Sequence, residues 1–247
     1  MKILLVTSQL TYMPDNYRPV LQGLLESHWR SISGVIILKN SGVSRLGSAL
    51  GLHLYGAHRM AKTLTNNFMG LVNDPRKPLM QSYSVPLYFR DTINDEWAID
   101  LMKDQQIDLV INLRTRCIYK KKILKLPTYG CINIHHGLLP KYRGTLCDLY
   151  ALAQNRPAGF TVHKMDAKID NGEIIRVCQV GQNQTDYLSY LKSTMQKEVE
   201  VLREILDQLQ HDQKFSHTLP NFCDGPIYSK NPSYQQIKDL KSQGMLL

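Results

Sequence analysis

Long hydrophobic runs are absent from this sequence. The longest apolar stretch near its amino terminus is Ile3-Leu4-Leu5-Val6, which is far too short to span a membrane or to form the core of a signal peptide. We therefore expect a cytoplasmic protein that makes no membrane contact.

Cysteine is sparse as well. The five cysteines stand apart, at positions 117, 131, 147, 178 and 223, and include no Cys-x-x-Cys pair. They also form no cluster with histidine at the spacing of a zinc site. We expect buried or idle thiols in a reducing compartment, and no metal.

Glycine is missing where a nucleotide-binding loop would need it. Residues 8–14, which follow the first predicted strand, read Ser-Gln-Leu-Thr-Tyr-Met-Pro. Loops that cradle phosphates need glycines so that the backbone can approach the ligand. This segment is therefore neither a dinucleotide-binding loop nor a P-loop.

Acidic residues are outnumbered by basic ones. The chain has 30 Lys and Arg against 21 Asp and Glu, which gives a net charge of +9. This excess favours an anionic partner such as a phosphate, a nucleotide, a nucleic acid or a polyglutamate tail. It does not choose among them, and a basic surface that is merely solvated gives the same count.

The apolar pattern that is present predicts an α/β fold. Short apolar runs at 2–7, 34–39, 108–112 and 130–135 indicate buried strands, and apolar residues at helical spacing follow the first of them. This order is typical of a mostly parallel central sheet with helices on both faces. The 247 residues suffice for one large domain, or one domain with a small extension.

Other segments complete this prediction. Residues 92–103 indicate a helix, 160–165 and 173–180 two more strands, and Asp186 the N-cap of a long helix. We expect a loop at 74–78 and an insertion or lid beside the sheet within 41–80. The predicted division is a domain over 1–212 and a C-terminal tail over 213–247 that packs on it.

Two polar residues end one of the predicted buried strands. Asn133 and His135 are two positions apart, so their side chains point to the same side of the strand. The carboxyl ends of parallel strands are where open α/β sheets bind ligands. Satisfied polar residues that merely end a strand fit the pattern about equally well.

A second polar cluster follows further along the chain. It consists of His163 on a predicted strand and Asp166, Lys168, Asp170 and Asn171-Gly172 in the next turn. Taken alone, an Asp before Asn-Gly is first of all a turn signal.

Together the two clusters have a recognisable form. The run Asn133-Ile-His-His-Gly-Leu-Leu-Pro-Lys-Tyr-Arg-Gly144 is followed by Asp170, 35 residues after His135. With the segment 118–133 before it, this resembles the 10-formyltetrahydrofolate-dependent formyltransferases, the family of glycinamide ribonucleotide, methionyl-tRNA and amino-sugar N-formyltransferases. The resemblance covers 105–182. His136 and Gly137 depart from it, since the family usually has Pro, Ala or Gly and then Ser at these positions.

The resemblance implies a Rossmann-like formyltransferase fold with a short C-terminal extension, and transfer of a formyl group from 10-formyltetrahydrofolate to a primary amine. Asn133 and His135 would donate hydrogen bonds to the tetrahedral oxyanion. Asp170 would favour the imidazolium form of His135 and position a water that carries the proton. No metal and no covalent nucleophile are implied.

The resemblance also implies binding residues. Beside it, we expect His163 and Arg143 to bind the acceptor, although strand histidines are often only satisfied polar residues. Arg143 is chosen for its charge and could equally meet the folate's glutamate or be solvated. The residues that the resemblance assigns to 10-formyltetrahydrofolate are Arg116, Cys117, Ile118, Tyr119, Leu138, Pro140, Asp166 and Lys168.

The acceptor is expected to be a small, anionic amine. The missing glycine-rich loop argues against glycinamide ribonucleotide, and the short tail leaves no room for the C-terminal barrel of the tRNA enzymes, so tRNA is not favoured. An amino-sugar nucleotide remains by elimination. Alternatives are hydrolysis of 10-formyltetrahydrofolate and a folate-binding module without catalysis.

Overall fold

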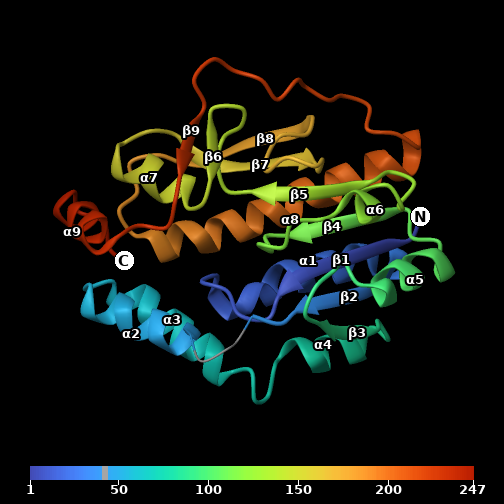
Figure 1. Ribbon diagram of the computed structural model, residues 1–247, viewed down its shortest axis with the longest axis horizontal. Coiled ribbons are helices and arrows are strands. Elements are labelled where there is room, and N and C mark those ends of the chain that lie inside the picture. Colours follow the sequence, from blue (N-terminus) through green and yellow to red (C-terminus); the bar gives the residue numbers. More distant parts are fainter. Residues whose placement is uncertain (41–43) are drawn as a thin grey trace.

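The computed structural model describes residues 1–40 and 44–247. Its centre is a seven-stranded sheet with the order β3-β2-β1-β4-β5-β7-β8 (Figure 1). The first five of these strands are parallel, whereas β7 is antiparallel to both of its neighbours. The predicted mostly parallel sheet is therefore confirmed. The strands are β1 (Ile3–Ser8), β2 (Ile32–Leu38), β3 (Leu87–Arg90), β4 (Leu109–Leu113), β5 (Cys131–His135), β7 (Ala158–Lys164) and β8 (Ile174–Gly181).

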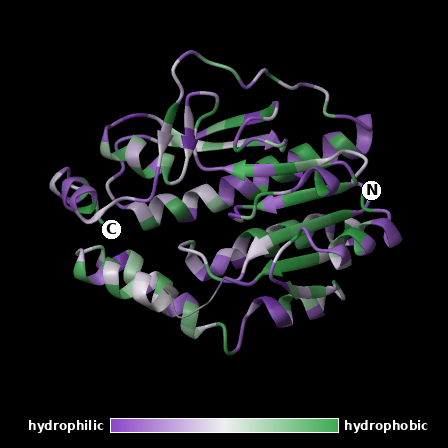
Figure 2. Ribbon diagram, viewed as in Figure 1, coloured by the Kyte–Doolittle hydropathy of each residue, from purple (hydrophilic) through white to green (hydrophobic). Residues whose placement is uncertain are grey.

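Helices cover both faces of this sheet. Because side chains alternate along a strand, β1 sends Ile3 and Leu5 into one core and Leu4 and Val6 into the other. The first core is closed by α1 (Arg18–His28) and α8 (Tyr187–Asp212), the second by α5 (Glu96–Asp104) and α6 (Lys121–Leu124). The central strands are accordingly apolar along almost their whole length (Figure 2).

Carboxylate caps set where two helices begin. Asp186 accepts a hydrogen bond from the Ser189 amide, so the long α8 begins where it was predicted. Asp95 accepts one from the Ala98 amide, so α5 begins at Glu96 rather than at 92. In the part of the chain that the structure describes, no helix is both long and apolar enough to cross a membrane.

Three helices lie between β2 and β3. They are α2 (Ser44–Leu54), α3 (His58–Met69) and α4 (Arg76–Ser82), while 41–43, which begin the predicted insertion, lie outside the described residues. The expected loop at 74–78 is wrong in its second half. The Asp74 carboxylate accepts the Arg76 amide hydrogen bond and pairs with its guanidinium, and Pro78 is tolerated in the first helical turn because amides there have no intrahelical partner.

The C-terminal segment runs back along the β8 edge of the sheet and then turns to the carboxyl ends of the parallel strands, where β9 (Ile227–Ser229) and α9 (Tyr234–Ser242) lie (Figure 1). Its short strand β9 pairs in parallel with β6 (Tyr142–Gly144). β6 forms the end of the run Asn133–Gly144 that carries the family resemblance, just before α7 (Cys147–Ala153). Gly144 has φ 98°, and a Cβ there would come within 2.1 Å of the Ser229 carbonyl oxygen. The final helix, α9 (Tyr234–Ser242), buries Ile237 and Leu240 in the larger core.

Candidate active site

The carboxyl end of β5 carries the two side chains that the sequence singled out. Asn133 pairs in register with His163 on β7, and His135 pairs with Thr161. His135 is only 5% exposed and Asn133 is half-buried. Both line one cavity, so the strand places an amide and an imidazole at the same edge of the sheet.

Asp170 reaches this pair from the turn between β7 and β8. Its Oδ2 atom lies 3.4 Å from His135 Nδ1, and its Oδ1 atom lies 3.7 Å from His163 Nε2. The residue has φ 49°, an uncommon conformation for a non-glycine residue. The Gly144 amide donates to Asp170 Oδ2 at 3.2 Å. The structure therefore brings Asn133, His135 and Asp170 together, although the turn alone gave no reason to expect it.

The orientation of Asn133 follows from its neighbours. Asn112 Nδ2 donates to Asn133 Oδ1 at 2.8 Å, and Asn133 Nδ2 lies 3.1 Å from His163 Nε2. His163 Nδ1 lies 2.7 Å from the Lys164 carbonyl oxygen, so Nδ1 carries the proton and Nε2 accepts. One N–H of Asn133 is thus used, and its second N–H remains available to a ligand.

Both histidines of this site favour the neutral form. Burial lowers the pKa of His163 to about 4. Burial also lowers the pKa of His135 below 6.5, while the Asp170 carboxylate opposes this shift. His135 Nε2 donates to the Tyr142 carbonyl oxygen at 2.8 Å. Its Nδ1 atom therefore faces Asp170 and is ready to accept a proton that the carboxylate would stabilise.

The nearby Cys147 thiol takes no part in this arrangement as a nucleophile. Its Sγ atom lies 3.9 Å from His135 Nε2 and 3.0 Å from Ser229 Oγ. Burial raises the pKa of the thiol to about 12, so it stays protonated at neutral pH. Among the described residues, no group of His, Cys, Asp or Glu side chains has the arrangement of a metal site.

The cavity has a volume of about 450 Å³, within the range of small-molecule sites. Ten of the thirteen side chains that the sequence assigned to the site line it: Asn133, His135, Asp170, Arg116, Cys117, Ile118, Tyr119, Asp166, Lys168 and His163.

The other three, Leu138, Pro140 and Arg143, are not among its lining residues. Arg143 is 5% exposed because its guanidinium is used inside the protein. It donates to the carbonyl oxygens of Pro140, Asp170 and Asn221. Arg143 therefore supports the turn that carries Asp170 and is not placed to meet an acceptor.

A buried ionic cluster, which the sequence analysis missed, lies next to the cavity. His136 Nδ1 lies 2.7 Å from Asp148 Oδ2, and its Nε2 atom contacts Glu198. Glu198 also accepts from the Tyr17 hydroxyl, and Asp148 accepts from the Tyr187 hydroxyl at 3.0 Å. Burial opposes a charge on His136, but the two carboxylates outweigh it and raise the His136 pKa.

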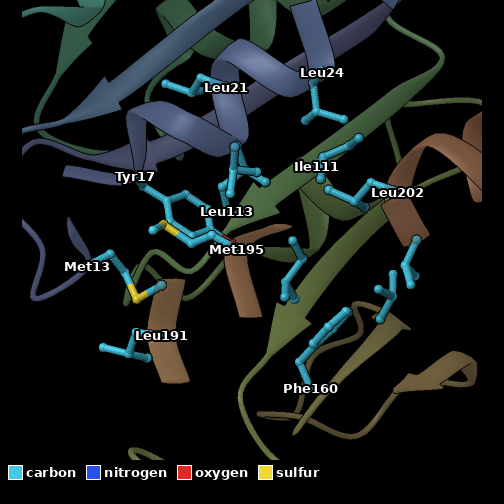
Figure 3. Packing of buried hydrophobic residues seen from close by; sticks show 14 of the residues in the cluster. Met13, Tyr17, Leu21, Leu24, Ile111, Leu113, Phe160, Leu191, Met195 and Leu202 are labelled. Carbon is cyan, nitrogen blue, oxygen red and sulfur yellow. The ribbon is translucent and has the colours of Figure 1, made fainter. Parts of the chain in front are cut away.

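Glu198 gave a usable signal in the sequence. It stands on the buried stripe of α8, between Met195 and Leu202, where a carboxylate is costly without partners. The departure at His136 from the family pattern was the second signal. Figure 3 shows Tyr17, whose hydroxyl donates to Glu198, and Met13 beside Leu191 and Met195 of α8.

The comparisons with known proteins agree with this geometry. Residues 70–206 match the model of a protein family described as formyl transferase. The methionyl-tRNA formyltransferase of Chlamydia abortus is 35% identical over 111 residues, which are 43% of this chain and 34% of that protein. That of Chlamydia caviae is 32% identical over 152 residues, which are 60% of this chain and 46% of that protein. The chain thus matches less than half of the length of these relatives.

Solved structures share the fold. The phosphoribosylglycinamide formyltransferase of Anaplasma phagocytophilum superposes with a TM-score of 0.60 at 18% identity, over 93% of this chain and 99% of that one. A sugar N-formyltransferase from Shewanella sp. FDAARGOS_354 gives a TM-score of 0.59 at 17% identity, over 98% and 88% of the two chains. At such low identity this likeness concerns the fold alone.

Proposed function

The chain belongs to the formyl transferase family, and from this premise we propose that it transfers a formyl group from 10-formyltetrahydrofolate to a primary amine. The observation that carries the proposal is the convergence of Asn133, His135 and Asp170 beside one cavity. An amide donor, an imidazole and a carboxylate are what acyl transfer to an amine needs: a donor for the oxyanion and an acceptor for the amine proton.

The donor would be held by the loops after β4 and β7. Residues 116–119 and 165–170 line the cavity, and two of their apolar side chains, Ile118 and Ile169, are each 63% exposed. An apolar surface left open beside polar backbone suits a flat heteroaromatic ring such as a pterin. When bound, 10-formyltetrahydrofolate supplies the activated formyl carbon.

Side chains of the protein would then stabilise the oxyanion and accept the proton of the amine. The unused N–H of Asn133 donates to the oxyanion as it forms, and loss of one such donor typically costs about 2.7–4 kcal/mol in the barrier. Neutral His135 and the Asp170 carboxylate would accept the proton that the attacking amine loses. The bond between the formyl carbon and N10 of tetrahydrofolate then breaks, and the same proton can pass to that leaving nitrogen. Since Asp170 lies 3.4 Å from His135 Nδ1, the imidazolium is stabilised as soon as it forms.

A small, anionic amine remains the first acceptor that we propose, with an amino-sugar nucleotide as the favoured class. Two solved structures of the same fold are described as sugar N-formyltransferases, one of them in the presence of dTDP and 5-N-formyl-THF. A second candidate is methionyl-tRNA. It is favoured by sequence, because the relatives with 28–35% identity are methionyl-tRNA formyltransferases, and by the net charge of +9.

One assay tests the reaction and separates these candidates. The protein is incubated with 10-formyltetrahydrofolate and either a panel of amino-sugar nucleotides or methionyl-tRNA, and mass spectrometry detects the formylated amine. Formylation that is abolished in Asn133→Ala but retained in Asn73→Ala, an exposed control, supports the proposal. Rapid formate release without any acceptor favours a hydrolase. Folate binding with no turnover, unchanged in Asn133→Ala, favours a binding module.

A further inference from the structure

The cavity extends to the place where the strand order of the sheet reverses. From β1 the chain continues to β2 and β3 on one side, and β4 and β5 lie on the other. Open α/β sheets bind ligands at this point, outside the carboxyl ends of the strands. Here the lining residues are mostly apolar or aromatic: Tyr12, Met13, Tyr17, Leu146, Tyr187 and Leu191.

Among the described residues, Arg114 is the arginine that lines this part of the cavity, and no lysine lies beside it in the lining formed by Tyr12, Met13, Tyr17, Leu146, Tyr187 and Leu191. It follows β4 directly, is half-buried and has φ 62°, a conformation that is uncommon outside glycine. Its side chain contacts the sulfur of Met13, and no carboxylate of the described residues lies within 4 Å of it. A guanidinium has five N–H donors, so most of its donors are left for a ligand.

Arg114 nevertheless keeps its positive charge. Burial opposes it, but Tyr17 and the carboxylates of Glu198 and Asp148 outweigh burial and raise the Arg114 pKa. These carboxylates accept hydrogen bonds from His136, Tyr17 and Tyr187, and none from Arg114 is found among the described residues. The acids therefore stabilise the cation from a distance without using its donors.

We propose that Arg114 binds an oxyanion, a carboxylate or a phosphate, of the molecule that accepts the formyl group. This inference rests on the proposed function and specifies its substrate: a primary amine that carries an anionic group within reach of the amine. The acceptor is the ligand concerned because the proposed donor loops are 116–119 and 165–170, whereas the side chain of Arg114 contacts Met13, in the segment that follows β1. Arg143, the arginine that the sequence assigned to the acceptor, is already occupied.

The planar fork of the guanidinium makes this site selective. An arginine forms two parallel hydrogen bonds with a carboxylate or phosphate, which a lysine cannot do. Next to an apolar wall, an uncharged amine of the same size gains none of these bonds. The structure thus predicts discrimination between matched amines that differ only in the anionic group.

Direct binding tests the inference without relying on turnover. Isothermal titration calorimetry at constant ionic strength compares 3-aminopropyl phosphate, 4-aminobutanoate and 3-aminopropanol as probes. We expect one or both anionic probes to bind at least about 10-fold tighter than the alcohol, as a charge-assisted hydrogen bond allows. The phosphate and carboxylate arms show which oxyanion is preferred.

Variants assign the effect to one side chain. Arg114→Met should reduce the anionic preference to less than about 2-fold. Arg114→Lys keeps a positive charge beside the carboxylates and replaces Arg114→Met if that variant fails to fold. It should retain only part of the anionic preference. Arg176→Met, which removes a partly exposed arginine paired with Glu204 on the surface, leaves the preference unchanged. Equal binding of all three probes by the wild type, or an unchanged preference in both Arg114 variants, overturns the inference.

The two proposals fail in distinguishable ways. If no amine is formylated but the anionic preference depends on Arg114, the oxyanion site stands and the proposed reaction falls. If amines are formylated and the catalytic efficiency is the same for charged and uncharged acceptors in wild type and Arg114→Lys, the reaction stands and the oxyanion site falls.

Discussion

His135 Nδ1 lies 3.4 Å from Asp170 Oδ2, although His135 ends strand β5 and Asp170 lies in the turn between β7 and β8. The other ring nitrogen of His135 donates to the Tyr142 carbonyl oxygen. The imidazole therefore lies between two hydrogen-bond acceptors. While the ring is neutral it carries one N–H, which it donates to the Tyr142 carbonyl oxygen, so Asp170 accepts no hydrogen bond from it. A proton gained by His135 during the reaction would complete the second hydrogen bond.

Loss of either partner should impair turnover more than folding. We expect Asp170→Asn and His135→Gln each to lower kcat for formyl transfer by at least about 100-fold, because the amine proton loses its acceptor or the imidazolium loses its counter-charge. Steady-state kinetics measure the effect, and circular dichroism checks the fold. Asp224→Asn and His211→Gln, at exposed positions, are the matched controls. A near-normal kcat in either site variant removes that residue from the mechanism.

The pH dependence of kcat should report the protonation of His135. Burial lowers the pKa of His135 below 6.5, and the neutral ring is the active form, so kcat should fall only on the acid side of pH 6.5. Asp170 opposes the shift, and Asp170→Asn should therefore lower the pKa further and move the acid limb to lower pH. Profiles at saturating substrates measure this. An acid limb above pH 6.5, or one that moves to higher pH in the variant, contradicts the assignment.

Much of the fold could be predicted because periodicity and caps act locally. Buried strands such as Ile3–Ser8 are continuous apolar runs, and Asp186 begins α8 through one side-chain hydrogen bond. The start of α4 could not be read from Pro75 before it and Pro78 within it, since it depends on the Asp74–Arg76 pair. The short strand β6 forms only because the distant β9 pairs with it.

The candidate site, too, could be predicted from the sequence only in part. Asn133 and His135 were found from strand periodicity, whereas Asp170 was assigned only through the family resemblance, because as a residue it is an ordinary turn former. Arg143 was assigned to the acceptor from its charge, and the structure places it inside, bonded to Asp170 and Asn221. Partners that belong to other segments decide such roles, and a single sequence does not show them.

Glu198, the buried acid of α8, should stabilise the folded protein. Glu198 is fully buried and contacts Tyr17 and His136, and a hydrogen bond to a charged group contributes about 1.5–3 kcal/mol. We expect Glu198→Gln to lower the free energy of unfolding by about 2–3 kcal/mol. Glu200→Gln, on the exposed side of the same helix, should change it by less than about 0.5 kcal/mol. Urea unfolding compares the two, and equal effects would contradict the importance of the cluster.

Gly137 should tolerate no side chain. A Cβ at this position would lie 2.4 Å from His135 Nε2 and 2.7 Å from the Tyr142 carbonyl oxygen, so Gly137→Ala must separate the two atoms that hold the imidazole. We expect kcat to fall by at least about 10-fold and stability by about 1–3 kcal/mol, as for other overpacked sites. Gly130→Ala is a poor control because φ there is 76°; Gly47→Ala meets no neighbouring atom. An unchanged kcat in Gly137→Ala shows that the ring position is not critical.

The C-terminal segment should position Asp170 for catalysis through Asn221. Asn221 Nδ2 donates to the carbonyl oxygens of Asp170 and Gly172 at 3.0 and 2.9 Å, and its own carbonyl oxygen and Oδ1 accept from Arg143. These bonds hold the turn in which Asp170 keeps φ 49°.

Asn221→Asp keeps the shape of this side chain but replaces the donating NH₂ with an oxygen, which repels both carbonyls. We expect kcat to fall by about 10-fold, since a small misplacement of a catalytic group is costly, while KM for either substrate changes little. The acid limb of the kcat profile should also move, because His135 loses the close carboxylate, and a merely structural role would not move it. Asn73→Asp, at an exposed position, is the control. If Asn221→Asp lowers stability but leaves kcat and the acid limb unchanged, Asn221 supports the fold alone and Asp170 is positioned without it.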